Sequence, residues 1–535
     1  MSADIVLSIK DLVVEAPTGT TLVDHVNVTL RRGEVLGLIG ESGAGKSTIG
    51  LAAMGYGRGG CRIAEGRVVV DGVSLMDGGR EIREKTRGAR IAYVAQSAAA
   101  AFNPAHRIGQ QIMEGPLYHS LMTKAEAKAW MLELLHALQL PEPDTFGDRY
   151  PHQVSGGQLQ RAMVAMAMSC RPDILVLDEP TTALDVTTQI EVLALLRSLI
   201  QRYGTAALYI THDLAVVAQI AGRIMVLRHG RMVESGSAEE VLEAPKEDYT
   251  RRLVAERKAS ISGEGADRAV GDILLEVKNA TAYYGRKLVL KDISCQIRRG
   301  ETLAVVGESG SGKSTLARII AGLPPHSSGI VNLDGRRLEA SYRKRSREEL
   351  RRIQLVYQLP DVALNPRQTV GEIIGRPMKF YFGMNEDQRE EEVRRLLDLI
   401  GLPADFAGRL PGALSGGQKQ RVCIARALAA KPDLIICDEV TSALDPLVAE
   451  EILRLLRRLQ DELKVSYLFI THDLGVVRRL ADRTMVMQKG EVVETGATHD
   501  IFEPPFKPYT EQLITSVPEL RRDWLDDILR MRAAG

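Results

Sequence analysis

The chain is 535 residues long and carries 69 Lys and Arg against 69 Asp and Glu, so its formal net charge is zero. Without a positive excess there is no general attraction to nucleic acid, and we expect no nucleic-acid partner. The length predicts more than one domain. The cysteines form no C-x-x-C pair, which favours buried, unpaired thiols in a reducing compartment over disulfides or a zinc site; they are Cys61, Cys170, Cys295, Cys423 and Cys437.

The N-terminal residues lack the basic and apolar regions of a secretory signal, so no signal peptide is expected. The longest apolar runs, such as Ala162–Met168, fall far short of the about 18–20 residues that span a bilayer. If the protein works at a membrane, we expect another chain to supply the membrane-spanning part.

A short apolar run, Val35–Ile39, predicts a buried strand that leads into a glycine-rich loop with the pattern G-x-x-x-x-G-K-S. Glycines let backbone N–H groups approach a triphosphate, Lys46 supplies a positive charge, and the Ser47 hydroxyl can ligate Mg²⁺. A single copy leaves open a plain strand-to-helix turn. The pattern returns, however, as Gly307–Ser314.

The next segments carry a glutamine, a helical stretch and a second short motif. Gln96 follows the apolar run 91–95 and could sense Mg²⁺. The segments Leu117 to Leu140 and Glu386 to Leu402 are rich in helix-forming residues and predict a helical subdomain inserted after each phosphate loop. The first of these segments is followed by Ser155-Gly156-Gly157-Gln158, and the second by Ser415-Gly416-Gly417-Gln418.

Two further apolar strands end in residues suited to phosphate chemistry. After the run 174–177, Asp178 is placed to hold Mg²⁺ through water, and Glu179 to polarise an attacking water. His212 leaves a second apolar run, which includes Tyr209 and Ile210, and could contact the γ-phosphate. Alone, each of these residues would more often be an ordinary strand-end residue. Their positions after a phosphate loop, and their recurrence as Asp438, Glu439 and His472, favour function.

The chain is one fold used twice. Lys46 and Lys313 are 267 positions apart, whereas Glu179 and Glu439 are separated by 260. The stretch between the copies is small, polar and glycine-bearing, which predicts a flexible linker. We therefore predict a domain at 1–258, a linker at 259–271 and a second domain at 272–535. Buried strands alternating with helices predict an α/β fold with parallel sheets and ligands at their carboxyl ends.

Together these motifs resemble the ATP-binding cassette (ABC) ATPases over nearly the whole chain. The Ser-Gly-Gly-Gln runs match the family's signature motif, and Thr182-Ala183-Leu184-Asp185 and Ser442-Ala443-Leu444-Asp445 match its D-loop. The resemblance implies two P-loop NTPase (RecA-like) nucleotide-binding domains in tandem, with ATP and Mg²⁺ as cofactors. It also implies that each ATP lies between one phosphate loop and the signature of the other cassette.

The predicted site residues fall into three groups. The predicted catalytic residues are Glu179, Glu439, His212 and His472. The predicted metal-site residues are Ser47, Gln96, Asp178, Ser314, Gln358 and Asp438. The predicted ATP-binding residues are Gly40, Glu41, Ser42, Gly43, Ala44, Gly45, Lys46, Ser47, Thr48, Tyr284, Gly307, Glu308, Ser309, Gly310, Ser311, Gly312, Lys313, Ser314, Thr315, Ser155, Gly156, Gly157, Gln158, Ser415, Gly416, Gly417 and Gln418.

A narrower resemblance links the chain to the peptide/nickel/opine branch of bacterial importers. It rests on Asn103-Pro104 and Asn365-Pro366 and on the segments around Tyr249 and Tyr509. It implies an ATPase subunit at the cytoplasmic face of the inner membrane, driving uptake of di- or oligopeptides or a similar small solute. The implied partners are two integral-membrane permease subunits and a periplasmic solute-binding protein.

The chain departs from that branch in two ways. No cysteine follows Cys437, so the C-terminal iron–sulfur cluster of many members is not expected. The family places an adenine-stacking aromatic 23 residues before the first loop glycine; Tyr284 stands there in the second half, but Pro17 in the first.

Two other classes of protein also contain such cassettes. Soluble tandem-cassette translation factors that act on the ribosome resemble this chain in cassette count, but they carry a long, charged, helical arm between the cassettes. The short linker and zero net charge argue against them. Exporters commonly carry their cassettes on the same chain as membrane helices, and the apolar runs of this chain are too short for such helices, which argues against an exporter.

Overall fold

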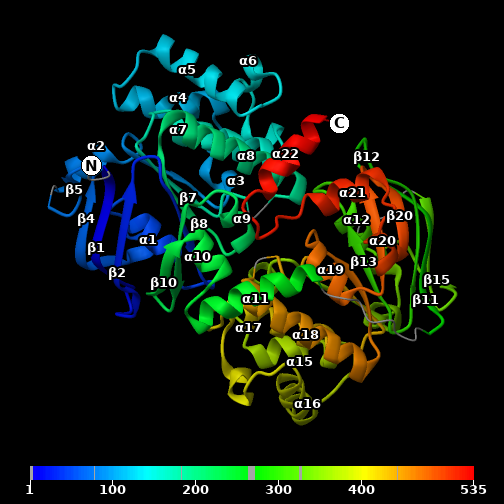
Figure 1. Cartoon of the computed structure of the whole chain (residues 1–535). Coiled ribbons are helices and arrows are strands. Elements are labelled where there is room, and N and C mark those ends of the chain that lie inside the picture. Colours follow the sequence, from blue (N-terminus) through cyan, green and yellow to red (C-terminus); the bar gives the residue numbers. More distant parts are fainter. Residues whose placement is uncertain are drawn as a thin grey trace. The chain divides into compact units, whose positions relative to one another are not determined.

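The computed structural model describes residues 4–77, 79–181, 184–262, 271–323, 328–442 and 444–534. These form two compact units (Figure 1). Unit 1 comprises Met1–Arg257 together with Pro518–Gly535, and unit 2 comprises Lys258–Val517. The chain therefore leaves unit 1 once and returns to it near its C-terminus.

Unit 1 contains an antiparallel sheet in the order β2-β1-β4-β5 and a six-stranded sheet in the order β10-β9-β3-β8-β7-β6. In the second sheet only the β9–β10 pair is antiparallel. The strands are β1 (Ile5–Glu15), β2 (Thr21–Arg31), β3 (Val35–Ile39), β4 (Arg62–Val70), β5 (Val73–Ser74), β6 (Ile91–Val94), β7 (Ile174–Asp178), β8 (Ala206–Ile210), β9 (Arg223–Arg228) and β10 (Arg231–Ser237).

The helices of unit 1 include the one that closes the chain. They are α1 (Lys46–Ala52), α2 (Gly79–Thr86), α3 (Ala98–Ala101), α4 (Ile108–Tyr118), α5 (Lys124–Ala137), α6 (Pro143–Phe146), α7 (Gly156–Met168), α8 (Val186–Tyr203), α9 (Leu214–Ala218), α10 (Ala238–Glu243), α11 (Asp248–Ser262) and α22 (Trp524–Ala534). The last residues of α11 lie beyond the boundary of the unit.

Unit 2 repeats this architecture, with sheets in the orders β12-β11-β14-β15 and β16-β17-β18-β13-β19-β20. Its strands are β11 (Ile273–Tyr284), β12 (Lys287–Arg298), β13 (Thr302–Val306), β14 (Ser328–Leu333), β15 (Arg336–Arg337), β16 (Ile353–Val356), β17 (Leu434–Asp438), β18 (Ser466–Ile470), β19 (Arg483–Gln488) and β20 (Glu491–Ala497). Its helices are α12 (Lys313–Ile320), α13 (Arg347–Arg352), α14 (Pro360–Ala363), α15 (Val370–Phe382), α16 (Glu386–Leu399), α17 (Gly416–Leu428), α18 (Pro446–Leu463), α19 (Leu474–Leu480), α20 (Thr498–Ile501) and α21 (Pro508–Thr515).

The core of each unit fixes the helix that follows the phosphate loop. In unit 1, Val26 of β2, Ile49 of α1 and Leu208 of β8 belong to one buried apolar cluster. Ile293, Leu316 and Leu468 belong to the corresponding cluster of unit 2. Each of these helices is therefore anchored by apolar burial to both sheets, which holds the start of the helix, and the loop before it, in a fixed position.

The strands that carry the predicted site residues lie side by side and point the same way. In the parallel pairing Leu38 is opposite Ile210, and Ile210 is in turn opposite Asp178. All residues of β3, β7 and β8 are buried, as their continuous apolar runs predict. Because parallel strands end at the same edge of a sheet, the residues after β3, β6, β7 and β8 gather there.

The helical subdomain differs from the prediction in one detail. The segment Leu117 to Leu140, predicted as one helical stretch, contains the end of α4 and then a break before α5. Thr123 causes the new start, because its side chain accepts a hydrogen bond from the backbone N–H of Glu126 and the Glu126 carboxylate accepts one from Thr123. In unit 2 the predicted helix from Glu386 is α16, which is capped by Asn385.

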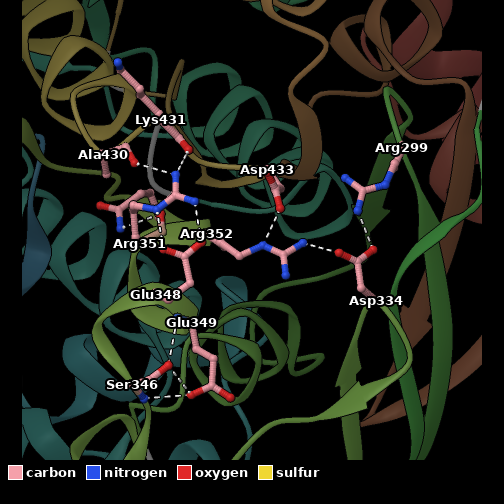
Figure 2. A network of polar contacts seen from close by, with 11 residues as sticks. Arg299, Asp334, Ser346, Glu348, Glu349, Arg351, Arg352, Ala430, Lys431 and Asp433 are labelled. Atoms are coloured by element: carbon pink, nitrogen blue, oxygen red, sulfur yellow. Dashed lines mark hydrogen bonds and ion pairs between the residues drawn. The ribbon is translucent and has the colours of Figure 1, made fainter. Parts of the chain in front are cut away.

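A row of alternating charges links the two sheets of each unit. It lies at the opposite end of the parallel strands from the predicted site residues. In unit 2, Arg299 pairs with Asp334, which also pairs with Arg352, and Arg352 pairs in turn with Asp433 (Figure 2). Asp334 follows β14, whereas Asp433 immediately precedes β17. Unit 1 repeats the row and closes it into a ring with Arg32, Asp71, Arg90 and Asp173.

The C-terminal segment is a correction to the predicted domain boundaries. Residues 518–535, predicted as part of the second domain, belong to unit 1. Trp524 and Leu525 are fully buried there, and apolar burial is what assigns a segment to a core. The predicted linker at 259–271 lies largely outside the described residues, and its first residues continue α11. Of the cysteines, Cys61 is only partly buried, whereas the other four are buried as predicted.

Candidate functional site

The phosphate loops are shaped around their first glycine. Gly40 has φ 156° and Gly307 has φ 145°, values that L side chains rarely adopt. A Cβ on Gly40 would lie 2.1 Å from the carbonyl oxygen of Leu227, and one on Gly307 would lie 2.1 Å from that of Met487. Only glycine fits where each loop leaves its strand.

A lysine closes each loop. Lys46 begins α1 and Lys313 begins α12, and both side chains are almost fully buried. Lys46 Nζ donates to the carbonyl oxygens of Gly40 and Glu41 at 2.6 and 2.8 Å. Lys313 Nζ repeats these bonds with Gly307 and Glu308 at 2.7 and 2.8 Å. The loop therefore wraps around its own ammonium group, which holds a positive charge at the centre of the loop.

A tyrosine from a distant helix supports each loop, and the sequence prediction did not include either tyrosine among the site residues. The hydroxyl of Tyr249 on α11 accepts a hydrogen bond from the backbone N–H of Glu41 at 3.2 Å. Tyr509 on α21 accepts one from the N–H of Glu308 at 3.1 Å. The equal spacing of the two tyrosines from the other repeated motifs was the only sequence signal for this role.

Each loop serine meets the aspartate that ends a neighbouring strand. Ser47 Oγ donates to Asp178 Oδ1 at 2.8 Å, and Ser314 Oγ donates to Asp438 Oδ1 at 2.9 Å. Burial is the largest influence on both carboxyl groups and raises the pKa of each above its ordinary value. A hydroxyl and a carboxylate are hard oxygen donors, and a divalent cation would offset the cost of burying the charge. The donor set therefore fits Mg²⁺.

Each glutamate of the acidic pairs lies between a glutamine and a histidine. Gln96 Nε2 donates to Glu179 Oε2 at 3.0 Å, and His212 Nδ1 lies 3.0 Å from Glu179 Oε1. Gln96 and Gln358 are the glutamines predicted for the metal site, and each contacts the glutamate of its unit. In unit 2, Gln358 Nε2 donates to Glu439 Oε2 at 2.7 Å, and His472 Nδ1 lies 3.5 Å from Glu439 Oε1.

Both glutamates have a strained backbone. Glu179 has φ 49° and Glu439 has φ 52°, in the left-handed region that costs a residue with a Cβ about 1 kcal/mol or more. The backbone N–H of Glu179 donates a hydrogen bond to the carbonyl oxygen of Ile210, and that of Glu439 donates one to the carbonyl oxygen of Ile470, both at 2.9 Å. These bonds turn the chain sharply after β7 and β17 and direct the carboxylates toward the histidines.

The contact with the glutamate favours the charged form of each histidine. Burial by itself lowers the pKa of His212 and His472, but the hydrogen bond to the glutamate and its negative charge outweigh burial and raise both pKa values. Burial likewise favours a higher pKa for Glu439, yet the bond to His472 and the charges of His472 and Lys313 bring that pKa below its usual value. In unit 2 the two groups therefore stabilise each other's charged forms.

The Ser-Gly-Gly-Gln motifs begin helices. Ser155 caps α7, with its Oγ accepting from the N–H of Gln158 at 3.3 Å and its own N–H donating to Gln158 Oε1 at 3.0 Å. Ser415 and Gln418 form the same capping box at the start of α17. The serine and the first glycine of each motif are exposed, whereas Gly157 is partly buried and Gly417 is buried. The glutamines thus act locally as caps. The second glycine of each motif makes room for the next helix, since a Cβ on Gly157 would lie 2.6 Å from Thr188 and one on Gly417 would lie 2.3 Å from Val448. Residues 182, 183 and 443 of the D-loops lie outside the described residues.

The predicted adenine position is asymmetric, as the sequence suggests. Tyr284 ends β11 with 46% of its surface exposed, and its hydroxyl lies 3.5 Å from the guanidinium of Arg318 on α12. The ring therefore lies beside the helix that Lys313 begins. Pro17, at the matching spacing in unit 1, is exposed.

Comparison with known proteins identifies the fold family. Residues 23–182 and 290–442 match the family described as "ABC transporter", and together they make up more than half of the chain. The chain belongs to the ABC transporter family. Residues 493–533 also match "Oligopeptide/dipeptide transporter, C-terminal region". The tandem α/β fold and the importer-branch resemblance predicted from the motifs are therefore confirmed.

Relatives named for glutathione import match the chain across both units. The glutathione import ATP-binding protein GsiA of Escherichia coli (strain K12) is 37% identical over 541 residues, covering 93% of this chain and 86% of the relative. GsiA of Pectobacterium atrosepticum is 38% identical over 548 residues, covering 93% and 87%. Among solved structures, cbiO1 from Clostridium perfringens, described as part of the ABC transporter complex cbiONQ, is 31% identical. That match covers 43% of this chain and 91% of cbiO1, with a TM-score of 0.40.

As an ABC ATPase, the protein binds ATP and hydrolyses it. No helix within the described ranges is long and apolar enough to cross a membrane. Besides Tyr249 and Tyr509, the sequence prediction missed Tyr93, whose hydroxyl contacts Asp178. An aromatic residue in an apolar strand carries no signal of such a contact, because pairing between distant strands creates it.

Proposed function

We propose that this ABC ATPase is the energy-supplying subunit of a bacterial importer. It binds and hydrolyses MgATP at two composite sites and drives the uptake of di- or oligopeptides, or a similar small solute. Two separate integral-membrane permease subunits carry the solute, which a periplasmic solute-binding protein delivers. The ATPase works as a peripheral protein at the cytoplasmic face of the inner membrane.

The observation that carries the proposal is the presence of the same constellation in both units. Each unit has a loop lysine, a serine–aspartate pair and a glutamate between glutamine and histidine. Neither set lacks a predicted catalytic group. Both sites are therefore proposed to hydrolyse ATP, unlike a chain in which one site has degenerated.

The residues divide the work as follows. The phosphate-loop N–H groups and Lys46 bind the β- and γ-phosphates, with Lys313 doing the same at the other site. Ser47 and Asp178, like Ser314 and Asp438, would hold Mg²⁺, which neutralises phosphate charge when bound. Glu179 and Glu439 polarise the attacking water. Hydrogen-bonded contact with Gln96 and His212 orients Glu179 for that task.

The signatures are proposed to complete the sites across the cassettes. A serine hydroxyl and free backbone N–H groups at a helix N-terminus suit a γ-phosphate. The start of α7 in unit 1 and that of α17 in unit 2 offer these groups. Each signature would then meet the nucleotide that the phosphate loop of the other unit binds.

The importer assignment and the solute class rest on the relatives. Proteins named for glutathione import match 93% of this chain, and glutathione is itself a small peptide. The match of residues 493–533 to the oligopeptide and dipeptide transporter region points to the same class of solute. A ribosomal translation factor is not favoured, because the relatives found here are import proteins.

The test uses the full-length protein purified from membranes of its own bacterium. Two multi-span permeases should co-purify, and vesicles containing the complex and the binding protein should take up a labelled dipeptide or tripeptide only with MgATP. The Glu179→Gln, Glu439→Gln double variant is the matched control, because it should still assemble and bind ATP but not transport. Recovery with ribosomes and without permeases would overturn the proposal.

A further inference from the structure

One hydroxyl distinguishes the two cation sites. Tyr93 of β6 donates a hydrogen bond from its hydroxyl to Asp178 Oδ2 at 2.5 Å. Asp178 Oδ1 accepts the bond from Ser47, so both oxygens of this carboxylate are held. The aspartate is only 6% exposed, which leaves little water to compete for either oxygen.

The strand register explains the contact. In the parallel pairing of β6 with β7, Tyr93 lies opposite Val176. Side chains two residues apart on a strand share a face, so Asp178 projects on the same side as Val176. A tyrosine is long enough to reach forward over that spacing. Its ring packs against the apolar core of unit 1 and leaves only the hydroxyl at the carboxylate.

Unit 2 has the same register without the hydroxyl. Leu355 of β16 lies opposite Ile436 of β17, as Tyr93 lies opposite Val176. Leu355 also packs against the core of its unit. The Asp438 carboxylate accepts from Ser314, as Asp178 does from Ser47. The two sites therefore share the serine and the aspartate, and they differ at the position beside the second carboxylate oxygen.

We propose that Tyr93 is a positioning residue that makes the two ATP sites unequal in their demand for a divalent cation. The inference rests on the proposed role of Asp178 at the cation site. A carboxylate fixed at both oxygens is already oriented toward the Ser47 side, so the cation need not order it on binding. Asp438 lacks this constraint from its strand neighbour. The first site should therefore fill with cation and nucleotide at a lower Mg²⁺ concentration than the second.

The experiment isolates each site in the full-length protein. Lys313→Ala weakens the second site and leaves the first to be measured; this variant is called the first-site protein. Lys46→Ala does the reverse and gives the second-site protein. A fluorescent ATP analogue is titrated at a series of Mg²⁺ concentrations, and bound Mn²⁺ is counted by electron paramagnetic resonance. In the first-site protein, Tyr93→Phe removes the hydroxyl and keeps the ring. It should raise the half-saturating cation concentration about tenfold, the lower end for loss of a group that orients a metal ligand.

The controls separate this role from a structural one. Leu355→Met in the second-site protein alters the equivalent position without adding a donor and should leave the cation demand unchanged. In excess chelator, the first-site protein should bind the analogue equally well with and without the Tyr93→Phe substitution, since the hydroxyl acts through the cation site. An unchanged cation demand in Tyr93→Phe, with or without a lower Tm, would overturn the inference. If neither unsubstituted site required a cation for tight nucleotide binding, the proposed function would fail instead.

Discussion

The side-chain amide of Gln219 donates a hydrogen bond at 2.8 Å to the backbone carbonyl of Glu519, 300 residues further along the chain. The same amide donates to the carbonyl oxygen of Arg521, and Gln219 Oε1 accepts from the N–H of Leu525. Arg197 of α8 pairs with Asp526 of α22. The C-terminal segment is therefore fastened to unit 1 at the end of α9, the helix that follows His212 and Asp213.

The matching position of unit 2 makes different contacts. Arg479 stands where the repeat would place a second Gln219, and it pairs with Glu450 of α18. The attachment of the C-terminal segment to α9, the helix after His212, is thus a property of the first cassette. Gln219 suits this attachment, because a glutamine can satisfy backbone donors and acceptors together whereas an arginine can only donate.

Replacing Gln219 should release the C-terminal segment. Gln219→Leu keeps a similar volume but removes the partner of two partly buried backbone carbonyls and of the buried N–H of Leu525. The expected cost is about 2 kcal/mol, or roughly thirtyfold in local opening. Hydrogen exchange should accelerate in α22 and spare β7 and β8. Arg530→Ala, at an exposed position on the same helix, is the control and should change nothing. Equal protection of α22 in both variants would show that the apolar contacts of Trp524 suffice.

Removing either carboxylate base should slow hydrolysis strongly. A positioned base typically contributes ~10²–10⁴-fold, so Glu179→Gln and Glu439→Gln should each reduce turnover by a large factor at the affected site. Glutamine retains the size and the contacts to Gln96 or Gln358, which keeps nucleotide binding intact. Steady-state ATPase assays and nucleotide titrations check this together. A single variant with full activity would identify a site that does not hydrolyse ATP.

Loss of the adenine-side tyrosine should affect one site only. Tyr284→Ala removes an exposed ring held near α12, and base–aromatic stacking is worth ~1–3 kcal/mol. ATP affinity should fall at the Lys313 site and remain at the Lys46 site. Titrations in the Lys46→Ala and Lys313→Ala backgrounds distinguish the two. Pro17→Ala is the control in unit 1, and an equal loss at both sites would contradict the assignment of Tyr284.

The tyrosines that support the phosphate loops should act locally. Tyr509→Phe removes the hydroxyl that accepts a hydrogen bond from the backbone N–H of Glu308. One such bond is worth about 1 kcal/mol, or roughly fivefold in affinity. ATP should bind more weakly at the second site alone. Tyr249→Phe should have the mirror effect at the first site. Each variant controls for the other, and a change at the wrong site would rule out local support.

The charge row of Figure 2 should stabilise unit 2 in a pH-dependent way. Arg352→Met leaves Asp433 without this arginine and Asp334 with only Arg299 of the row. The free energy of unfolding should fall by about 1–2 kcal/mol, because the pairs are partly exposed. Burial favours a higher pKa for Asp334, but its bonds to Arg352 and Arg299 outweigh burial and bring the pKa below the ordinary value of 3.8.

The sign of the effect follows from that lowered pKa. A depressed carboxyl pKa stabilises the fold above the ordinary value and loses its contribution as the pH falls through the folded-state value. The Tm difference between Arg352→Met and the unsubstituted protein should therefore be full at neutral pH and shrink below pH 3.8. Arg394→Met, at an exposed pair in the same unit, is the control. A difference that stays constant down to strongly acidic pH would contradict the role of Asp334.

The sequence by itself determined the repeated α/β architecture and most of the chemical groups. Runs such as Val35–Ile39 are short and apolar throughout, which favours buried strands, and loop glycines, lysines and acidic pairs follow them directly in the chain. These relationships are local, and local patterns can be seen along the sequence. The break before α5 was also encoded locally, by Thr123 and Glu126, although the helical composition around it concealed the cap.

Only the tertiary structure decided which groups meet. Tyr93 reaches Asp178 because two strands distant in sequence pair in one register. Gln96 contacts Glu179, and not the serine–aspartate pair, because of where parallel strands end. The C-terminal segment belongs to unit 1 because Trp524 and Leu525 find an apolar surface there, a preference that position in the chain does not express. Contacts between distant segments depend on shape and register, and neither is written in the local order of residues.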